Sequence, residues 1–162
     1  MILGIISDTH DRLTRTKVAV AMLLDAGAEA IVHCGDLNTP PILEACAVTP
    51  CWFVFGNNDD DSIPELHEAA RELGAVCLEW GGVFDLGGRR IGVTHGHMRS
   101  DVHKLFKQAP DYLLTGHSHI AGQEKHGRIV RINPGALHRA AVHTVATLDL
   151  QSGGVHWLRV LK

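Results

Sequence analysis

The sequence predicts an α/β fold in which two mixed β-sheets pack face to face and helices cover their outer faces, a four-layer αββα sandwich. Residues 2–74 alternate short apolar runs with segments of helical periodicity, which indicates parallel strands joined by helical crossovers. Residues 76–161 are instead rich in strand-like runs separated by glycine turns. At 162 residues the chain fits one domain, residues 1–162, so the two regions are expected to pack as two sheets around shared cores.

The first half predicts the strand–helix alternation in detail. Buried strands are expected at residues 2–6, 30–34 and 51–55, since each is a short apolar run. Helices are expected at residues 13–26, between Thr39 and Pro50, and at residues 62–73. Thr39 and Ser62 belong to the residue types that cap helices with a side-chain oxygen, and proline follows each in the first turn.

The second half predicts hairpins. Strands are expected at residues 76–79, 83–86, 89–94, 111–115, 122–126, 128–132, 143–149 and 155–161, with one short helix at residues 101–108. Gly87-Gly88, Gly127 and Ser152-Gly153-Gly154 separate neighbouring runs and are typical of turns. Exposed strand edges in this half make pairing between subunits, and hence a homo-oligomer, an open alternative.

Composition and charge argue against several classes of protein. The formal net charge of −3 gives no general attraction to nucleic acid or to anionic membranes. No segment approaches the roughly 20 apolar residues that cross a bilayer, and no secretory leader is expected. The four cysteines form no Cys-x-x-Cys pair and are interpreted as small buried hydrophobic residues in a reducing compartment. A cytoplasmic protein is expected.

Side chains that bind metals follow five of the expected strands. They are Asp8 and His10, Asp36, Asn57, His95, and the pair His117 and His119. In sheets with helical crossovers, ligands bind beyond the carboxyl ends of the strands, so one shared site explains the recurrence. Seven ligands are too many for one tetrahedral ion and suit two ions if a carboxylate bridges them. Mixed nitrogen and oxygen ligands favour Mn, Fe, Ni or Zn over Ca.

Two neighbouring cations suit the hydrolysis of phosphoesters, because they bind the phosphate oxygens and lower the pKa of bound water. The sequence has no Gly-x-Ser-x-Gly elbow and no glycine-rich phosphate loop ending in Gly-Lys-Ser/Thr. The metal ions themselves are therefore the expected source of the nucleophile, and a small phosphoester is the expected substrate.

The motifs Asp8-x-His10, Gly35-Asp36, Gly56-Asn57-x-Asp59, His95-Gly96-His97 and Gly116-His117-x-His119, in this order, resemble those of the calcineurin-like metallophosphoesterases. The short chain, the Thr-His-Gly-His block and Asn133-Pro134-Gly135 resemble the YfcE-like branch of small phosphodiesterases. The resemblance implies the αββα sandwich and hydrolysis of a phosphodiester or phosphomonoester by a hydroxide held between two ions. It implies that one ion is held by Asp8, His10, Asp36 and His119, and that Asp36 bridges to a second ion held by Asn57, His95 and His117.

One position departs from the family pattern. Many members have histidine directly after the motif asparagine, whereas this chain has Asn58, which cannot act as an acid. His97 is the nearest candidate for a substitute acid or phosphate contact; the alternative is a histidine that is only packed in its loop. Asp59 is expected either to orient a metal ligand or to cap a turn. Without a general acid, activity is expected to favour activated aryl phosphodiesters over alkyl phosphomonoesters.

Two other functions remain as alternatives. The small subunit of the retromer coat shares the fold of this family and is a scaffold with degraded metal motifs, whereas every ligand position here has a competent side chain. A nuclease would resemble the related DNA-repair exonucleases, but these have additional capping segments, and the net negative charge disfavours binding to a duplex.

Overall fold

The computed structural model describes residues 1–161 and contains eleven strands, four α-helices and one short 3₁₀ turn among them. One sheet, called sheet A, contains β1 (Ile2–Ile6), β2 (Ala28–His33), β3 (Cys51–Phe53), β4 (Val76–Cys77), β10 (Thr144–Asp149) and β11 (Val155–Arg159). The other, sheet B, contains β5 (Gly81–Leu86), β6 (Arg89–Thr94), β7 (Tyr112–Leu114), β8 (Gly122–His126) and β9 (Ile129–Asn133). The helices are α1 (Leu13–Asp25), α2 (Pro40–Cys46), α3 (Ile63–Leu73) and α4 (Arg99–Lys107), and the 3₁₀ turn is η1 (Asp60–Ser62).

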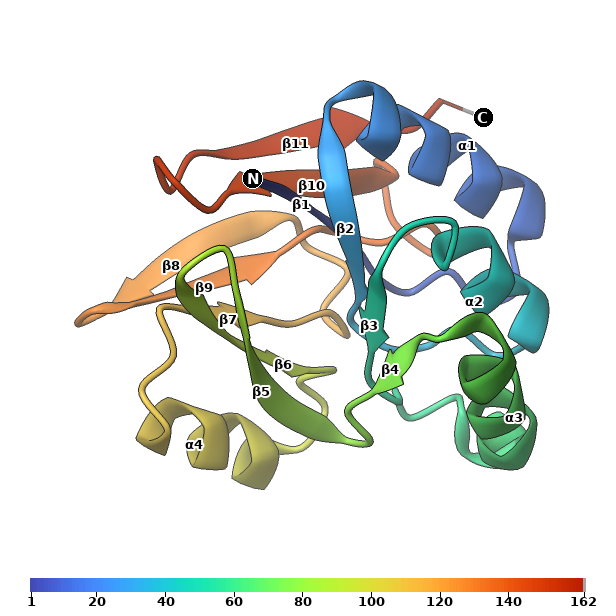
Figure 1. The fold of residues 1–162 in the computed structure, drawn as a ribbon, viewed down its shortest axis with the longest axis horizontal. Helices are drawn as coiled ribbons and strands as arrows, with labels where there is room; N and C mark the ends of the chain where they lie inside the picture. Colours follow the sequence, from blue (N-terminus) through green and yellow to red (C-terminus); the bar gives the residue numbers. More distant parts are fainter. Residues whose placement is uncertain (162) are drawn as a thin grey trace.

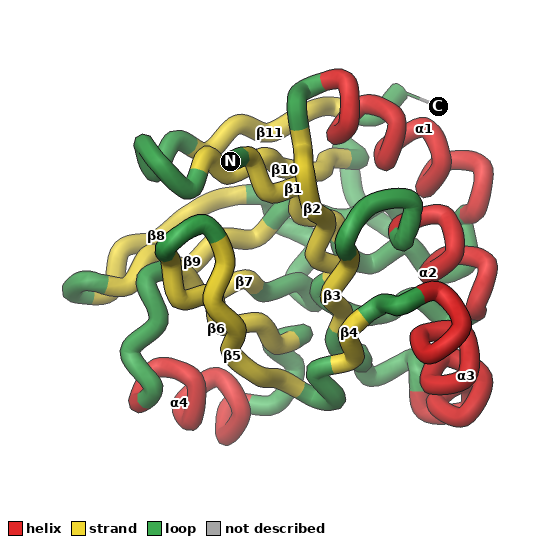
Figure 2. Tube along the Cα trace, in the orientation of Figure 1, coloured by secondary structure: helices red, strands yellow, loops and turns green. Residues whose placement is uncertain are grey.

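The two sheets form the predicted sandwich (Figure 1). Sheet A has the strand order β11-β10-β1-β2-β3-β4, with β1 to β4 parallel and β10 and β11 added antiparallel at one edge. Sheet B has the order β5-β6-β7-β9-β8, in which β6, β7 and β9 are parallel. Figure 2 shows α1, α2 and α3 together along one side of the molecule and α4 alone at another. Both sheets are therefore mixed, as the sequence predicts.

Alternating side chains of the central strand β1 divide the interior into two cores. Leu3 and Ile5 lie in the core between the sheets, which also contains Ile91 and Leu114 of sheet B. Ile6 lies in the other core, between sheet A and helices α1 to α3. Full burial of one such side chain contributes about 1.5–3 kcal/mol. Because β1 contributes to both cores, the segment that follows it is anchored on two faces.

Two details of the sequence prediction are wrong. Neither Thr39 nor Ser62 caps its helix with the side chain. The Thr39 hydroxyl instead donates to Asp11, at 2.6 Å, and the Ser62 hydroxyl donates to the backbone carbonyl of Asn38. Both hydroxyls thus tie together loops at the carboxyl edge of sheet A, a use that local helix rules do not anticipate.

Element boundaries differ by a few residues from those expected. The strand expected at residues 76–79 ends at Cys77, because Glu79 adopts a left-handed conformation with φ of 56°. The helix expected at residues 101–108 begins at Arg99 and ends at Lys107. Within residues 1–161, none of the helices combines the length and the apolar character that crossing a membrane requires.

Candidate metal centre

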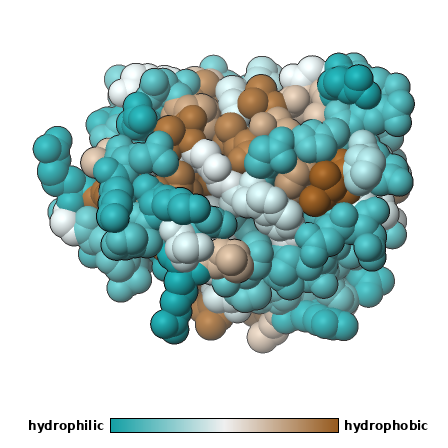
Figure 3. Space-filling model, turned by 90° about the horizontal axis from the view of Figure 1, so that it is seen from below, coloured by the Kyte–Doolittle hydropathy of each residue, from teal (hydrophilic) through white to brown (hydrophobic). Residues whose placement is uncertain are grey.

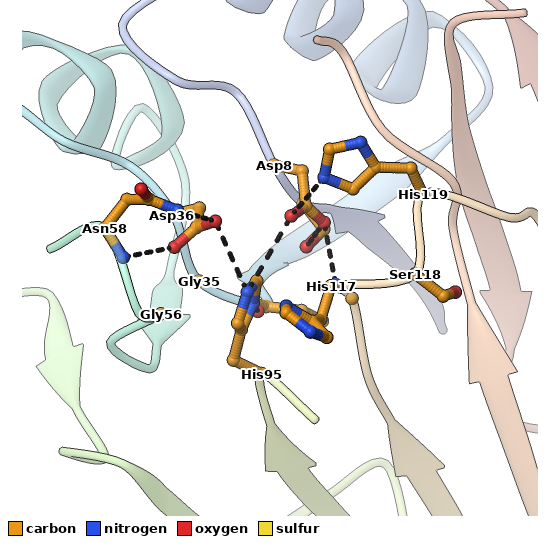
Figure 4. Close-up of polar contacts among 12 residues, drawn as sticks. Asp8, Gly35, Asp36, Gly56, Asn58, His95, His117, Ser118 and His119 are labelled. Carbon is orange, nitrogen blue, oxygen red and sulfur yellow. Dashed lines mark hydrogen bonds and ion pairs between the residues drawn. The ribbon is translucent and has the colours of Figure 1, made fainter. Parts of the chain in front are cut away.

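The candidate ligands lie where five strands end, three in sheet A and two in sheet B. The segments after β1, β2 and β3 carry Asp8 and His10, Asp36, and Asn57; those after β6 and β7 carry His95, and His117 and His119. The strands within each of these two groups are parallel, so their carboxyl ends share one edge of each sheet. Figure 4 shows Asp8, Asp36 and the labelled imidazoles converging from both sheets on one space.

Asp8 is the fully buried centre of this arrangement. Its Oδ2 accepts hydrogen bonds from the Ser7 hydroxyl at 2.6 Å and from the backbone N–H of His117 at 3.1 Å. Its Oδ1 faces three imidazole Nε2 atoms, which belong to His119 at 3.0 Å, His95 at 3.8 Å and His10 at 4.0 Å. One oxygen thus fixes the side chain, and the other faces the shared space.

Asp36 lies between histidines of the two sheets. Its Oδ2 is 3.3 Å from Nε2 of His10 and 3.4 Å from Nε2 of His95. Asn58 donates its backbone N–H to Oδ1 at 2.9 Å and its side-chain amide to Oδ2 at 2.8 Å. The Asp36 carboxylate therefore lies within reach of one histidine from each sheet.

Several ligand atoms at this point are buried without a hydrogen-bond partner. They are Oδ1 of Asp8 and Nε2 of both His10 and His95. Leaving a buried polar atom unpaired costs about 1–3 kcal/mol, so three such atoms aimed at one space indicate a missing partner. These residues belong to two overlapping triads, Asp8-His10-His119 and Asp8-Asp36-His95. Within each triad, the ligand atoms lie within 4.8 Å of one another. Carboxylate oxygen and imidazole nitrogen together fit a divalent metal ion.

The charges of the triads are coupled. Burial alone would raise the pKa of Asp36, but His95 and the donors of Asn58 outweigh it and hold the pKa well below its usual range. Burial also acts to lower the pKa of His95, yet the close approach of Asp36 and the charge of Asp8 outweigh it and raise this pKa. For His10 burial prevails and lowers the pKa. The site thus keeps Asp36 ionised, which is the state that a metal ligand requires.

Glycines make room for the ligands. A Cβ atom on Gly35 would lie 2.7 Å from Nδ1 of His95. One on Gly56 would collide with Asp36, and one on Gly116 would collide with Ser7 and lie 2.6 Å from Oδ2 of Asp8. The glycine before each of three ligand motifs is therefore a steric requirement for close approach between neighbouring loops.

Most of the ligand positions have a left-handed backbone. The positive φ angles are 52° at Asp8, 40° at His10, 60° at Asp36, 66° at His117 and 59° at His119. Asp and His are among the residues that tolerate this region, which costs of order 1–3 kcal/mol for residues other than glycine. These sharp turns at the strand ends direct both histidines of the Gly116-His117-x-His119 motif toward the site.

Asp59 holds two of these loops together. Its Oδ2 accepts the backbone N–H groups of Asp36, at 2.8 Å, and of Gly56, at 2.7 Å, and its Oδ1 accepts that of Asn38 at 2.7 Å. Burial raises the pKa of Asp59, although these three donors favour its charged form. Of the two interpretations of Asp59, the contacts support the one in which it orients the loop that carries a metal ligand.

His33 lies beneath the site and is a buried, hydrogen-bonded residue of the core. Its Nε2 is 3.1 Å from the Thr9 hydroxyl, and its Nδ1 accepts the N–H of Gly35 at 3.2 Å. Burial, together with the charge of His95, lowers the pKa of His33 to about 3. The neutral imidazole therefore acts as a structural link between the Asp8 and Asp36 loops.

Asn57 and His97 lie to one side of this cluster. The Asn57 side chain is exposed and lines an adjacent cavity, whereas Asn58 is the asparagine that contacts Asp36. His97 lines the same cavity, and its ring centroid is 5.4 Å from that of His95 and 6.0 Å from that of His117. Its Nδ1 is buried without a hydrogen-bond partner, and burial and the neighbouring histidines lower its pKa.

Three further residues contact the candidate ligands or their neighbours and were not predicted from the sequence: Ser7, Arg12 and Arg139. Ser7 supports Asp8 directly, and its place immediately before the motif was the available signal. Arg12 donates from Nε to Nδ1 of His138 at 3.3 Å, and the His138 ring centroid is 5.0 Å from that of His10. The backbone carbonyl of Arg139 lies 3.3 Å from Nδ1 of His119. Nothing in the spacing of these arginines connects them to the metal motifs.

A sandwich of two mixed sheets whose facing strand ends gather carboxylates and imidazoles defines a class, the metal-dependent hydrolases. Residues 1–153 match the family model of the calcineurin-like phosphoesterase superfamily domain, and the chain therefore belongs to that superfamily. It is a metal-dependent phosphoesterase.

Curated relatives include Phosphodiesterase MJ0936 of Methanocaldococcus jannaschii, 26% identical over 93% of this chain and 94% of the relative. The probable metallophosphoesterase YsnB of Bacillus subtilis is 31% identical over 94% of this chain and 88% of the relative. Among solved structures, an archaeal phosphodiesterase has a TM-score of 0.88 at 24% identity, covering 98% and 99% of the two chains. YfcE, a phosphoesterase from E. coli, has a TM-score of 0.71 at 21% identity, covering 99% and 100%. Vps29 of Entamoeba histolytica has the same fold, with a TM-score of 0.64 at 19% identity, covering 99% and 98%.

Proposed function

We propose that the protein hydrolyses phosphodiesters at a centre of two divalent metal ions, one held by Asp8, His10, Asp36 and His119 and one by Asp36, Asn57, His95 and His117. The observation that carries this proposal is the convergence of unpartnered ligand atoms from both sheets, with Asp36 between His10 and His95. When bound, such ions supply positive charge for the phosphate oxygens and lower the pKa of water near phosphorus. Asn57 reaches an ion in this proposal by turning its exposed side chain inward.

The chain's own residues set the rest of the chemistry. Asn58 holds Asp36 and offers no acidic proton, so it positions a ligand without protonating the leaving group. His97 is our candidate for contact with the phosphate or the leaving oxygen, because its unpartnered Nδ1 lies beside His95 and His117. Asp59 acts as a positioning residue through its bonds to the Asp36 loop. A site with no dedicated strong acid favours leaving groups that depart as stable anions.

The proposal includes a small phosphoester substrate and a reducing, cytoplasmic setting. All four cysteines are free, and burial raises the pKa of Cys51 to about 12 and that of Cys77 to about 11. These thiols are therefore protonated and unreactive at neutral pH. Mn, Ni, Fe and Zn all suit the ligand set.

Metal analysis combined with a substrate panel tests the proposal. The purified protein is expected to bind two equivalents of Mn²⁺, Ni²⁺ or Zn²⁺ and to hydrolyse bis(4-nitrophenyl) phosphate at least about tenfold faster than an alkyl phosphomonoester, since a general acid is worth about 10²–10⁴-fold for poor leaving groups. Equal rates on both substrates would contradict the preference. A protein that holds no transition metal and hydrolyses nothing would favour the scaffold alternative, for which the Vps29 neighbours show the fold alone.

A further inference from the structure

A cavity of about 690 Å³ lies beside the metal centre. It is bounded by the bend between β4 and β5, by the loop from β6 to α4 and by α4 itself. Asn57 and His97 line it, and His97 also neighbours the rings of His95 and His117. A phosphoester held by the metal ligands therefore has room for one of its substituents on this side, in a space of the size that small-molecule sites have.

The cavity has a flat apolar wall. Trp80, Met98 and Leu105 line it, and Trp80 is the fixed member of the three. The Trp80 ring centroid lies 5.6 Å from that of Phe55 and 5.9 Å from that of His97, and its carbonyl accepts the Thr94 hydroxyl at 2.8 Å. On the face of the molecule seen from below, apolar and pale surface lies across the middle among hydrophilic side chains (Figure 3). An indole in the wall of a cavity offers apolar aromatic surface against which a flat group can pack.

The charges that line the cavity are mainly negative. Asp60, Glu79 and Asp101 contribute carboxylates, against the single ammonium of Lys104. Lys104 is 73% exposed and lies 3.5 Å from Asp101, so these two charges partly compensate each other and the carboxylates of Asp60 and Glu79 remain. Glu79 lies 3.4 Å from Nε2 of His67. A substituent that carries a phosphate or carboxylate would meet like charges here, whereas a cation would meet carboxylates and the face of an indole.

The opposite polarity is found beside His10. Arg12 contacts His138, whose ring packs near that of His10, and the charge of Arg139 acts on the pKa of His10. The surroundings of the metal ligands are thus basic near His10 and acidic near His97. An asymmetric phosphodiester would be oriented by this difference, with its more anionic part near the arginines.

We propose that this cavity, which we call the Trp80 cavity, receives the leaving group of the phosphoester and selects a flat, apolar group that carries no negative charge. The inference deepens the proposed function and rests on it for the identity of the occupant. It excludes nucleotides and other phosphate-bearing alcohols as preferred leaving groups. A positively charged aryl group is expected to be the best occupant.

The first test measures binding without turnover. The metal-free protein is titrated calorimetrically with benzyltrimethylammonium and with phenylmethanesulfonate, which share a ring and differ in charge. The cation is expected to bind at least about tenfold more tightly. Trp80→Ala should weaken its binding about tenfold, and the double change Asp60→Asn with Asp101→Asn should close most of the gap between the two probes. Glu44→Gln, on the exposed face of α2, is the matched control and should change neither affinity.

The second test uses the metal-loaded enzyme and three methyl aryl phosphodiesters. Their phenols carry trimethylammonium, methoxy or sulfonate through a methylene group, and rates are corrected for the reactivity of the free esters toward hydroxide. The kcat/KM values are expected to fall from the cationic to the neutral to the anionic ester, and the order should flatten in the double variant. The inference would be overturned if the titration showed equal affinities for the two probes or a preference for the anion. It would also be overturned if the difference in affinity remained unchanged both in Trp80→Ala and in the Asp60→Asn, Asp101→Asn double variant. An enzyme that cleaves none of the esters would instead refute the proposed function, while the titration still decides what the cavity binds.

Discussion

Sheet A and sheet B contribute chemically different ligands to the same site. The segments that follow β1, β2 and β3 supply all the carboxylates, and Asp8, Asp36 and Asp59 are buried. The segments that follow β6 and β7 supply only imidazoles, of which His117 is exposed. Carboxylates lose much hydration on burial and need fixed donors, which the backbone N–H of Asn58 provides for Asp36 and the backbone N–H of His117, from sheet B, provides for Asp8. The imidazoles of sheet B range from fully buried at His95 to exposed at His117. The difference teaches that sheet A supplies the negative charge of the site, and sheet B adds imidazole nitrogen beside it.

The largest effect is expected when one candidate ligand from each sheet is replaced by asparagine. Asp36→Asn should remove both ions, because Asp36 lies against histidines of both triads, and should lower kcat/KM about 10³-fold, equivalent to about 4 kcal/mol. His117→Asn should leave one equivalent of metal bound. Metal content by mass spectrometry and kcat/KM are the measurements. Full metal content and full turnover in Asp36→Asn would show that the bridging role belongs elsewhere, with Asp8, which both triads share, as the next candidate.

A methyl group at the contact between the sheets should have the next largest effect. In Gly116→Ala the new Cβ would meet Ser7 and Asp8 of sheet A, so urea denaturation should show a loss of about 3 kcal/mol. Gly122→Ala, in β8, is the control because nothing lies within 4 Å of its Cβ, and its stability should stay within about 1 kcal/mol of wild type. Equal losses in both variants would mean that the approach of sheet B to Asp8 is less constrained than the geometry indicates.

The smallest expected effect is on the pH dependence of the free energy of unfolding. It comes from His33, the neutral imidazole beneath the carboxylates of sheet A. The folded-state pKa of His33, about 3, lies below the unfolded value of about 6.5, so its contribution to stability is present above pH 6.5 and is lost as the pH falls. The loss is at most about 1.4 kcal/mol per pH unit, or about 2 kcal/mol between pH 6.5 and 5. His33→Asn keeps an acceptor for Gly35 and does not titrate. Its unfolding free energy in the metal-free protein should therefore depend less steeply on pH, and equal slopes would refute the assignment.

The sequence predicts most of the fold and of the ligand set because both depend on local patterns. Apolar runs that end in Asp, Asn or His identify β1, β2, β3, β6 and β7, and parallel pairing places their ends together. The part that Asp59 plays in orienting the Asp36 loop depends on three N–H groups from two loops. The contacts of Thr39 and Ser62 depend on loops packed against them. These hydrogen-bond partners are far apart in the sequence, and their spacing has no regular period from which the contacts could be predicted. Both Asn57 and Asn58 are exposed, and the choice of Asn58 as the one that contacts Asp36 is likewise a matter of rotamer and loop geometry.

The pairing of β1 with both β2 and β10 has a consequence for the protein's synthesis. Residues 2–5 pair with residues 146–149, so one edge of the first strand stays uncovered until residues 146–149 have left the ribosome. Until residue 119 has emerged, the nascent polypeptide also lacks the two histidines that follow β7. Before β10 is available, the uncovered edge of β1 is the surface on which a chaperone would act.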